Sequence, residues 1–348
     1  MKLPAVDMDF LVRFLTDLLN IPSPTGFSHL AIDFVEQTLQ PFPAVSCRRT
    51  HKGGLLVRWD GESADHPRAL TAHVDTLGAL VKEIKPNGRL KLSKLGGFAW
   101  NTVEGEGCTI FKFDGGCERG SILFCKPSVH VHGQVVGDTK REDANIEVRL
   151  DFDTSTAEET LAAGISVGDY VVFDARVEVT NGYIRSRHLD DKACVANLVS
   201  AVKSMSDAGI KPAQTTYLLI SNFEEVGHGA SSGIPAEVEE LLAVDMAAIG
   251  EGQTSDEHFA SICVKDSGGP YHHGFSSQLR RLADRYQIPY KVDIYTHYGS
   301  DGGAFLRAGG DVRVALIGPG VDASHNYERT HLDGLLATTQ WVMAYLME

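Results

Sequence analysis

The chain has 348 residues, 43% of them hydrophobic and 22% charged, which is the composition of a globular protein rather than a disordered one. Its 46 Asp and Glu against 32 Lys and Arg give a net charge of −14, which argues against a nucleic-acid partner or an anionic membrane surface. This length exceeds what one hydrophobic core usually serves, so two domains are expected.

The six cysteines form no C-x-x-C pair, which argues against a zinc ribbon or a thioredoxin-like site. In a chain of this length they are typical of reduced, buried thiols. Residues 1–20 carry acids among apolar residues, as in an amphipathic helix and unlike a signal peptide. No apolar run approaches membrane-spanning length. We therefore expect a cytoplasmic protein.

The N-terminal region is expected to form two helices, a hairpin turn and a strand. Apolar residues recur at helical spacing in the first helix, and Pro22 follows it as a stop signal. The strand carries His73 and Asp75 at its carboxyl end. The expected positions are residues 10–19 and 28–39 for the helices, 51–54 for the turn and 68–80 for the strand.

The texture of the sequence changes after Gly78. Short β-like runs, such as residues 121–133, 145–153 and 169–179, are separated by glycine, proline and charged turns. Apart from residues 157–164, this region contains no convincing amphipathic helix. It predicts a small all-β, barrel-like domain inserted at residues 77–185.

From residue 186 onward, helical and strand patterns alternate again. Such alternation predicts an α/β fold, with a three-layer αβα catalytic domain around a central mixed sheet. This domain is discontinuous and comprises residues 1–76 and 186–348. The expected helices follow Asp191 and cover 274–288, 301–309 and 332–347, and the expected strands cover 214–223, 241–250, 290–295 and 312–318.

Ionisable residues gather at the predicted strand ends, where ligands bind in open α/β sheets. Each is ordinary when taken alone; Asp190 or Asp191, for example, could simply cap a helix. Asp245 is more telling, because a carboxylate within an apolar strand must be paired or bound to metal. Carboxylates and imidazoles converging on one edge suit zinc or a similar ion. The set is His73, Asp75, Asp190, Asp191, Glu224, Glu225, Asp245 and His325.

The motifs that contain these residues resemble one family over essentially the whole chain. They are AHVDTLG, HLDDK, EEVGHGA, VDM, SGGP, YGSDGGA and SHNYERT. Together they are similar to the tetrahedral, deblocking or glutamyl aminopeptidases, which form metallopeptidase family forty-two.

The resemblance implies an aminopeptidase that hydrolyses amino-terminal residues from peptides, through a metal-bridging water activated by a glutamate base. It implies two divalent metal ions per subunit, zinc first, with cobalt and manganese as alternatives. It also implies a homo-oligomer, such as a tetrahedral dodecamer, in which the inserted domain serves assembly and substrate access.

The resemblance further implies a role for each metal ligand. Asp190 would bridge the two ions. His73 and Asp245 would complete one site, and Glu225 and His325 the other.

Glu224 would be the general base beside its metal-binding neighbour Glu225. Adjacent side chains on a regular strand point to opposite faces, but a strand that stops and turns can aim both into one cleft. Asp75 would accept the second ring N–H of His73 and fix its tautomer. Asp191 would hold the turn around the bridging ligand, as in the dinuclear metallo-aminopeptidase clan that this family resemblance implies.

Several residues depart from the family pattern or have no assigned role. Lys192 stands where arginine is common, and the turn after EEVG contains His228. His188 and His228 are expected to be surface histidines. Ser300 or Asp301 is expected to cap a helix. The preferred amino-terminal residue of the substrate stays undetermined.

Three other functions are weaker. A deacylase or carboxypeptidase of the same clan, acting on acylated amino acids or dipeptides, would place its inserted domain after the later ligands. A glycoside hydrolase needs carboxyl groups on opposite sides of a sugar, which adjacent Glu224 and Glu225 rarely provide. A non-catalytic scaffold would not need every ligand and the base.

Overall fold

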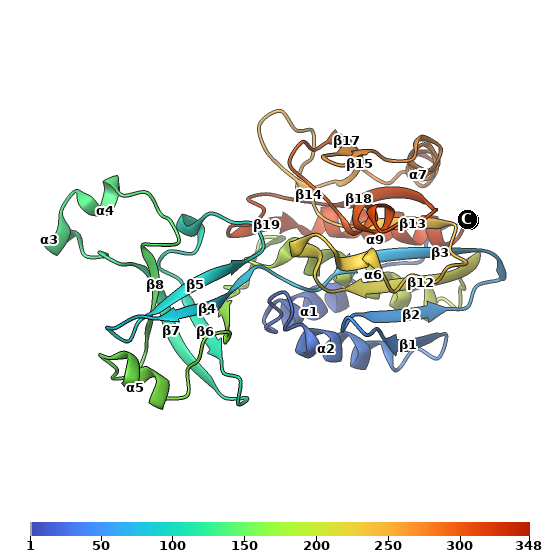
Figure 1. Cartoon of the computed structure of the whole chain (residues 1–348). Helices are drawn as coiled ribbons and strands as arrows, with labels where there is room; N and C mark the ends of the chain where they lie inside the picture. The colour runs from blue at the N-terminus through green and yellow to red at the C-terminus, as the bar shows by residue number, and fades with distance from the viewer. Residues whose placement is uncertain (1) are drawn as a thin grey trace. The chain divides into compact units, whose positions relative to one another are not determined.

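The computed structural model describes residues 2–348, which divide into two compact units (Figure 1). The first unit contains the residues up to Thr76 together with Arg176–Glu348, and the second contains Leu77–Ala175. Within residues 2–348, no helix has the length and apolar character needed to cross a membrane. The cysteines are all free thiols.

A ten-stranded sheet forms the centre of the first unit (Figure 1). Neighbouring strands β12, β3, β13 and β18 run parallel, whereas β2 pairs antiparallel with β1 and β12, and β15 pairs antiparallel with β18, so the sheet is mixed. The spatial order is β1 (Val45–Arg49), β2 (Leu55–Trp59), β12 (Gln214–Ser221), β3 (Ser63–His73), β13 (Glu240–Val244), β18 (Arg313–Val321), β15 (Ala260–Asp266) and β16 (Gly269–Pro270), with β14 (Ala247–Ala248) on β18 and β17 (Tyr290–Ile294) on β15.

Side chains from both faces of this sheet are buried. In β3, Leu70 and Ala72 join one hydrophobic cluster and Ala69 joins the other, as the alternation of a strand requires. The second cluster also takes in Phe305 of α8 (Asp301–Arg307). The first is formed with α1 (Met8–Leu19), α2 (His29–Leu39), α6 (Leu189–Asp207), α7 (His273–Tyr286) and α9 (Leu332–Leu346). The predicted α/β fold with a central mixed sheet is thereby confirmed.

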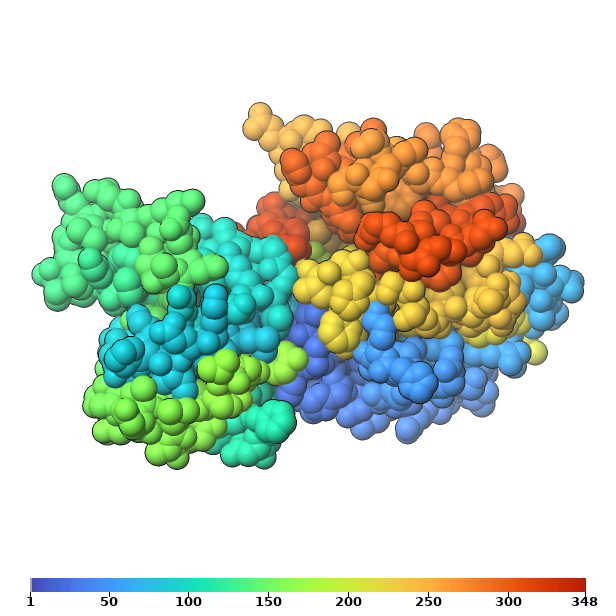
Figure 2. All heavy atoms as spheres, viewed as in Figure 1, coloured from blue at the N-terminus to red at the C-terminus, as the bar shows by residue number. Residues whose placement is uncertain are grey.

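Segments far apart in the sequence lie side by side in the first unit. Strand β2 pairs with β12, and in the space-filling view blue surface from the N-terminal part of the chain adjoins yellow surface from a much later part (Figure 2). A second, three-stranded sheet joins β10 (Glu178–Thr180), β11 (Tyr183–Ser186) and β19 (Glu328–His331). Residues 176–185 were expected to belong to the insertion. In the structure they form β10 and most of β11, and β11 pairs with β19 near the C-terminus of the first unit.

The second unit is a closed six-stranded antiparallel barrel, in agreement with the predicted β character. Its interior is filled by apolar side chains such as Val81, Ile110 and Val148. The strand order is β4 (Gly78–Ile84), β5 (Leu90–Leu95), β8 (Ile146–Leu150), β7 (Cys117–Phe124), β6 (Gly107–Phe111) and β9 (Tyr170–Phe173).

The expected β run at residues 121–133 is wrong in its second half. Strand β7 ends at Phe124, and two short helices follow, α3 (Val129–His132) and α4 (Val135–Asp138). Pro127 has no N–H to donate to a strand ladder, which explains why the strand does not continue. The expected helix at 157–164 is present as α5 (Ala157–Ala162) and begins with a capping box at Thr156. A 3₁₀ turn, η1 (Trp100–Thr102), completes the unit.

Candidate functional site

Most of the ionisable side chains singled out from the sequence lie at one edge of the sheet, at or beyond the carboxyl ends of four parallel strands. His73 is the last residue of β3, and Glu224 and Glu225 follow β12. Asp245 follows β13, and His325 follows β18. Since these strands are adjacent in the sheet, segments widely separated in the sequence meet at this edge.

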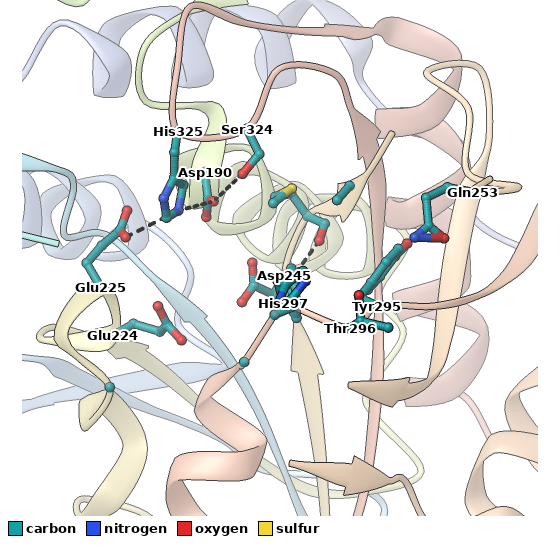
Figure 3. A pocket seen from close by; sticks show the side chains of 15 residues that line it. Asp190, Glu224, Glu225, Asp245, Gln253, Tyr295, Thr296, His297, Ser324 and His325 are labelled. Carbon is teal, nitrogen blue, oxygen red and sulfur yellow. Dashed lines mark hydrogen bonds and ion pairs between the residues drawn. The ribbon is translucent and has the colours of Figure 1, made fainter. Parts of the chain in front are cut away.

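Asp190 lies between the two histidines. It sits at the start of α6 with non-helical backbone angles, and its peptide bond to Asp191 is cis. One carboxylate oxygen is 3.2 Å from Nε2 of His73, and the other is 3.4 Å from Nε2 of His325. Figure 3 shows His325 and Ser324 directed toward this carboxylate. A single aspartate thus offers one oxygen to each side of the site.

Two groups of potential metal ligands share this aspartate. His73 and Asp245 form one group with Asp190, and Glu225 and His325 form the other. Within each group the ligand atoms lie within 4.8 Å of one another. Nε2 of His325 is 3.5 Å from Oε2 of Glu225. These are the five ligands that the family resemblance implies, and the structure brings all of them together.

The chemistry of these side chains fits divalent cations. Burial raises the pKa of Glu224, Glu225 and Asp245, and their negatively charged neighbours raise it further. Burial would also raise the pKa of Asp190, but hydrogen bonds with His325 and His73 lower it overall. Buried carboxylates crowded in this way need positive charge nearby, and mixed nitrogen and oxygen donors suit zinc and similar ions. The residues present could therefore hold two such ions.

Asp75 acts on the turn after β12 more than on His73. The Asp75 carbonyl oxygen lies 3.0 Å from Nδ1 of His73, whereas its carboxylate lies 3.6 Å away. The carboxylate accepts hydrogen bonds from Thr25 Oγ1 at 2.6 Å and from the backbone N–H groups of Glu224 and Glu225 at 3.1 and 3.4 Å. The expected carboxylate contact is thus replaced by a backbone one. The carboxylate instead holds the 3₁₀ turn η2 (Glu224–Val226).

Asp245 lies just beyond its strand rather than inside it, which corrects the expected strand at 241–250. Strand β13 ends at Val244, and the Asp245 N–H donates to the carbonyl of Ile317. The Asp245 carbonyl comes so close to Gly318 that a Cβ on that glycine would lie 1.8 Å from it. Gly318 therefore allows the backbone of Asp245 to approach β18 closely, which a residue with a side chain would prevent.

Glu328 is a positioning residue that the sequence reasoning missed. It is fully buried on β19, and its two carboxylate oxygens accept the backbone N–H groups of Asp190 and His325, both at 3.0 Å. One side chain thus holds the backbones of both Asp190 and His325. The sequence did contain a sign of this role, because Glu328 is the acidic residue of the SHNYERT motif.

Asp301 is the second positioning residue, and it lies in the first turn of α8 rather than at its cap. Ser300 occupies the cap position of α8, but its hydroxyl pairs with Tyr271 at 2.8 Å instead of capping the helix. The buried Asp301 carboxylate accepts the N–H of Ala230 at 2.7 Å and the hydroxyl of Thr71 at 2.8 Å. It also accepts the hydroxyl of Ser221. Asp301 therefore joins β3, β12 and the segment after η2, including η3 (Gly229–Ser231).

The remaining residues with open roles separate into buried and exposed ones. His228 is exposed, as expected, but His188 is buried, so the expectation of a surface position is wrong for His188. Lys192 is also buried, and its Nζ donates to the carbonyls of Leu18 and Ile21 at the end of α1, at 3.0 and 2.7 Å. Burial lowers the pKa of Lys192 to about 7. Lys192, which stands where arginine is common in the family, therefore contacts the end of α1.

A cavity of about 530 Å³ opens over the ligand groups. In Figure 3 the carboxylates of Glu224 and Glu225 both point into it, although the two residues are neighbours in the chain. The wall beyond Asp245 contains Tyr295 and His297. The cavity thus combines carboxylates at its base with aromatic and imidazole groups at its side.

A mixed α/β sheet whose strand ends carry two ligand groups with a shared aspartate is typical of two-metal hydrolases. Residues 53–340 match the family described as M42 glutamyl aminopeptidase. The chain belongs to this family of metallo-aminopeptidases.

Individual relatives agree with this assignment. Over 336 residues, which is 96% of each chain, it is 47% identical to Putative aminopeptidase YhfE of Bacillus subtilis (strain 168). The fold is similar to that of a TET aminopeptidase from a marine sediment Thaumarchaeota archaeon, with a TM-score of 0.87 at 18% identity over 98% of this chain and 96% of the other. It is similar as well to the Pyrococcus horikoshii TET1 peptidase, with a TM-score of 0.85 at 21% identity over 97% and 99%.

Proposed function

We propose that this chain removes amino-terminal residues from peptides with the help of two divalent metal ions, zinc first. Asp190 would be shared between them, with His73 and Asp245 on one side and Glu225 and His325 on the other. The observation that carries the proposal is that Asp190 offers one carboxylate oxygen to each ligand group. When bound, such ions act as Lewis acids that polarise the scissile carbonyl and make water a better nucleophile.

Glu224 is the general base in this proposal. It lines the cavity but belongs to neither ligand group, and its Oε2 lies 3.7 Å from Nε2 of His73. Its carboxylate takes a proton from the attacking water as the new C–O bond forms. It then gives that proton to the leaving nitrogen as the C–N bond breaks. Asp75 supports this step, because its carboxylate holds the Glu224 N–H.

The charge of the cavity supports recognition of a free amino terminus. No lysine or arginine is among the described residues that line it, so a substrate carboxylate would find no cationic side chain at this end, whereas Glu224 could accept a hydrogen bond from an amine. The peptide then extends away with its first bond over the shared ligand. This orientation distinguishes an aminopeptidase from a carboxypeptidase or a deacylase of the same clan.

Three versions of one short peptide test the substrate assignment. One has both ends free, one is acetylated at the amino terminus and one is amidated at the carboxyl terminus. We expect cleavage of the first and third, with the amino-terminal residue released, loss of activity on chelation, and its return with zinc, cobalt or manganese added singly. Cleavage of the acetylated version alone would establish a deacylase instead. Release of carboxyl-terminal residues would establish a carboxypeptidase.

We also propose that the second unit (Leu77–Ala175) serves assembly into a homo-oligomer. It exposes large apolar side chains, with Phe113 98%, Val131 73% and Val167 67% accessible. Exposed apolar surface on a small domain is usually covered by a partner, most often a symmetric copy. The Pyrococcus horikoshii TET1 peptidase can assemble into a tetrahedron or a large octahedral shell.

Light scattering coupled to gel filtration tests the assembly. A mass corresponding to a tetrahedral dodecamer is expected, with access to the cavities restricted to peptides. An active particle no larger than a dimer would rule out the shell. A monomer with full activity would rule out any assembly role for the second unit.

A further inference from the structure

A third group of ligand-type side chains lies in the first unit, outside the two groups that share Asp190. His258 precedes β15, His331 is the last residue of β19, and Asp333 lies in the first turn of α9. One ligand atom from each lies within 4.8 Å of the others. Three separate segments of the chain thus contribute one potential ligand each, and the proposed peptidase reaction uses none of them.

The spacing of these atoms matches that of ligands around one small cation. Oδ2 of Asp333 is 2.9 Å from Nδ1 of His258 and 3.2 Å from Nδ1 of His331. Ligand atoms about 2.0–2.1 Å from a tetrahedral zinc ion lie roughly 3.3 Å from one another. The two imidazole rings face each other at 4.0 Å between centroids, with a tilt of 37°. Both rings therefore present the same nitrogen to one carboxylate oxygen.

In the structure, hydrogen bonds occupy the two nitrogens that an ion would take. Nδ1 of His331 accepts the backbone N–H of Asp333 at 3.1 Å, so it carries no proton, and its one lone pair would exchange this hydrogen bond for a bond to the ion. Oδ2 of Asp333 lies within hydrogen-bond distance of Nδ1 of His258, at 2.9 Å, and an ion would replace the proton that this pair shares. Nε2 of His331 is covered, since a Cβ on Gly182 would lie 2.4 Å from it.

His258 has a partner for the tautomer that metal binding requires. Its Nε2 lies 3.3 Å from the hydroxyl of Tyr183. With its proton on Nε2, His258 donates to that hydroxyl and leaves Nδ1 free as a ligand, as metal-bound histidines commonly do. The side chains of His258, His331 and Asp333 are 40%, 15% and 59% exposed, so an ion can reach the group from solvent.

We propose that His258, His331 and Asp333 form a third divalent-metal site, for zinc or a borderline metal such as cobalt or nickel, with water at the remaining position. An ion there would tie the end of β19 to α9 and to the turn before β15. Since β19 also carries Glu328, the site would stabilise the strand that holds the backbone of Asp190 and His325.

Calorimetric titration with zinc chloride tests the proposal on the full-length enzyme after its peptidase site has been loaded. Wild-type protein should take up one further equivalent of zinc per chain, and its melting temperature should rise with it. His258→Gln and Asp333→Asn should weaken that binding by more than the roughly 10–100-fold lost when only a ligand's hydrogen-bond partner is removed. His331 is a poorer choice, because its side chain caps α9.

His66→Gln is the matched control. His66 also pairs with a carboxylate, Glu239 at 3.0 Å, but it belongs to none of the ligand groups described for residues 2–348. This variant should bind zinc like the wild type. Glu225→Gln should weaken a peptidase-site ion and keep the third equivalent, which separates the two assignments. Equal zinc stoichiometry and affinity in wild type, His258→Gln and Asp333→Asn would overturn the proposal.

Discussion

Replacing Glu328 by glutamine tests whether the ligands are held through their backbones. In the structure each carboxylate oxygen accepts one buried N–H, from Asp190 and from His325, both at 3.0 Å. A glutamine side chain has one acceptor oxygen and one NH₂ group. One backbone N–H would therefore lose its acceptor and face another donor.

The size of the effect follows from that lost contact. A hydrogen bond to a charged group contributes about 1.5–3 kcal/mol, and leaving a buried donor unpaired costs a comparable amount. For a domain of 150–250 residues, each kcal/mol lowers the melting temperature by roughly 2–4 °C. A loss of about 2 kcal/mol thus predicts a decrease of roughly 4–8 °C in metal-free Glu328→Gln protein. Zinc affinity at the peptidase site should also fall, because both affected residues are proposed ligands.

Differential scanning calorimetry of metal-free protein and a competitive zinc titration give the two readouts. Glu257→Gln is the control, since Glu257 pairs with Arg329 in a partly exposed salt bridge on the neighbouring surface. Such pairs contribute about 0–1 kcal/mol. The control should therefore melt close to the wild type. If Glu328→Gln retained both the wild-type melting temperature and its zinc affinity, a positioning role for Glu328 would be wrong.

Two further predictions concern the backbone crossing near the site and the thiols. Gly318→Ala should weaken metal binding and lower the melting temperature, because its Cβ would meet the Asp245 carbonyl at 1.8 Å. Gly250→Ala is the control, since a Cβ there would have open space around it. Equal zinc titrations of the two variants would refute this reasoning. At pH 8, iodoacetamide should label the exposed Cys117 and leave Cys108 unmodified, because burial raises the pKa of Cys108 to about 12 and a raised pKa leaves almost no thiolate. Mass spectrometry of the folded protein reads this out, and early labelling of Cys108 would contradict it.

The parts of the fold that depend on local pattern were predictable. Helix α1 and the closing helix α9 follow from apolar spacing, and the alternation of elements indicates the α/β class. Strand β15 (Ala260–Asp266) was not predicted, since it is a short apolar run next to charged residues with no clear alternation. The end of β13 was misplaced because the sequence does not show that its pairing with β18 stops at Val244 and resumes at β14.

The residues of the candidate site were predictable where their type and their order in the sequence indicate metal chemistry. His73 and His325 were identified because imidazoles at strand ends suggest metal chemistry. Glu328 and Asp301 act through contacts with backbone N–H groups of residues distant in the sequence, and the sequence does not show such contacts. The same holds for Asp75, whose carboxylate contacts the turn η2 instead of the histidine beside it.

The central claim is that Glu224 moves the proton while its neighbour Glu225 binds metal. The most direct test measures metal content and kcat of Glu224→Gln on the same preparation, with an unblocked peptide as substrate. About two ions per chain are expected at the peptidase site, as in a two-metal hydrolase. The kcat should fall by roughly 10²–10⁴-fold, which is what a positioned base contributes. A kcat close to that of the wild type with both ions bound would contradict it.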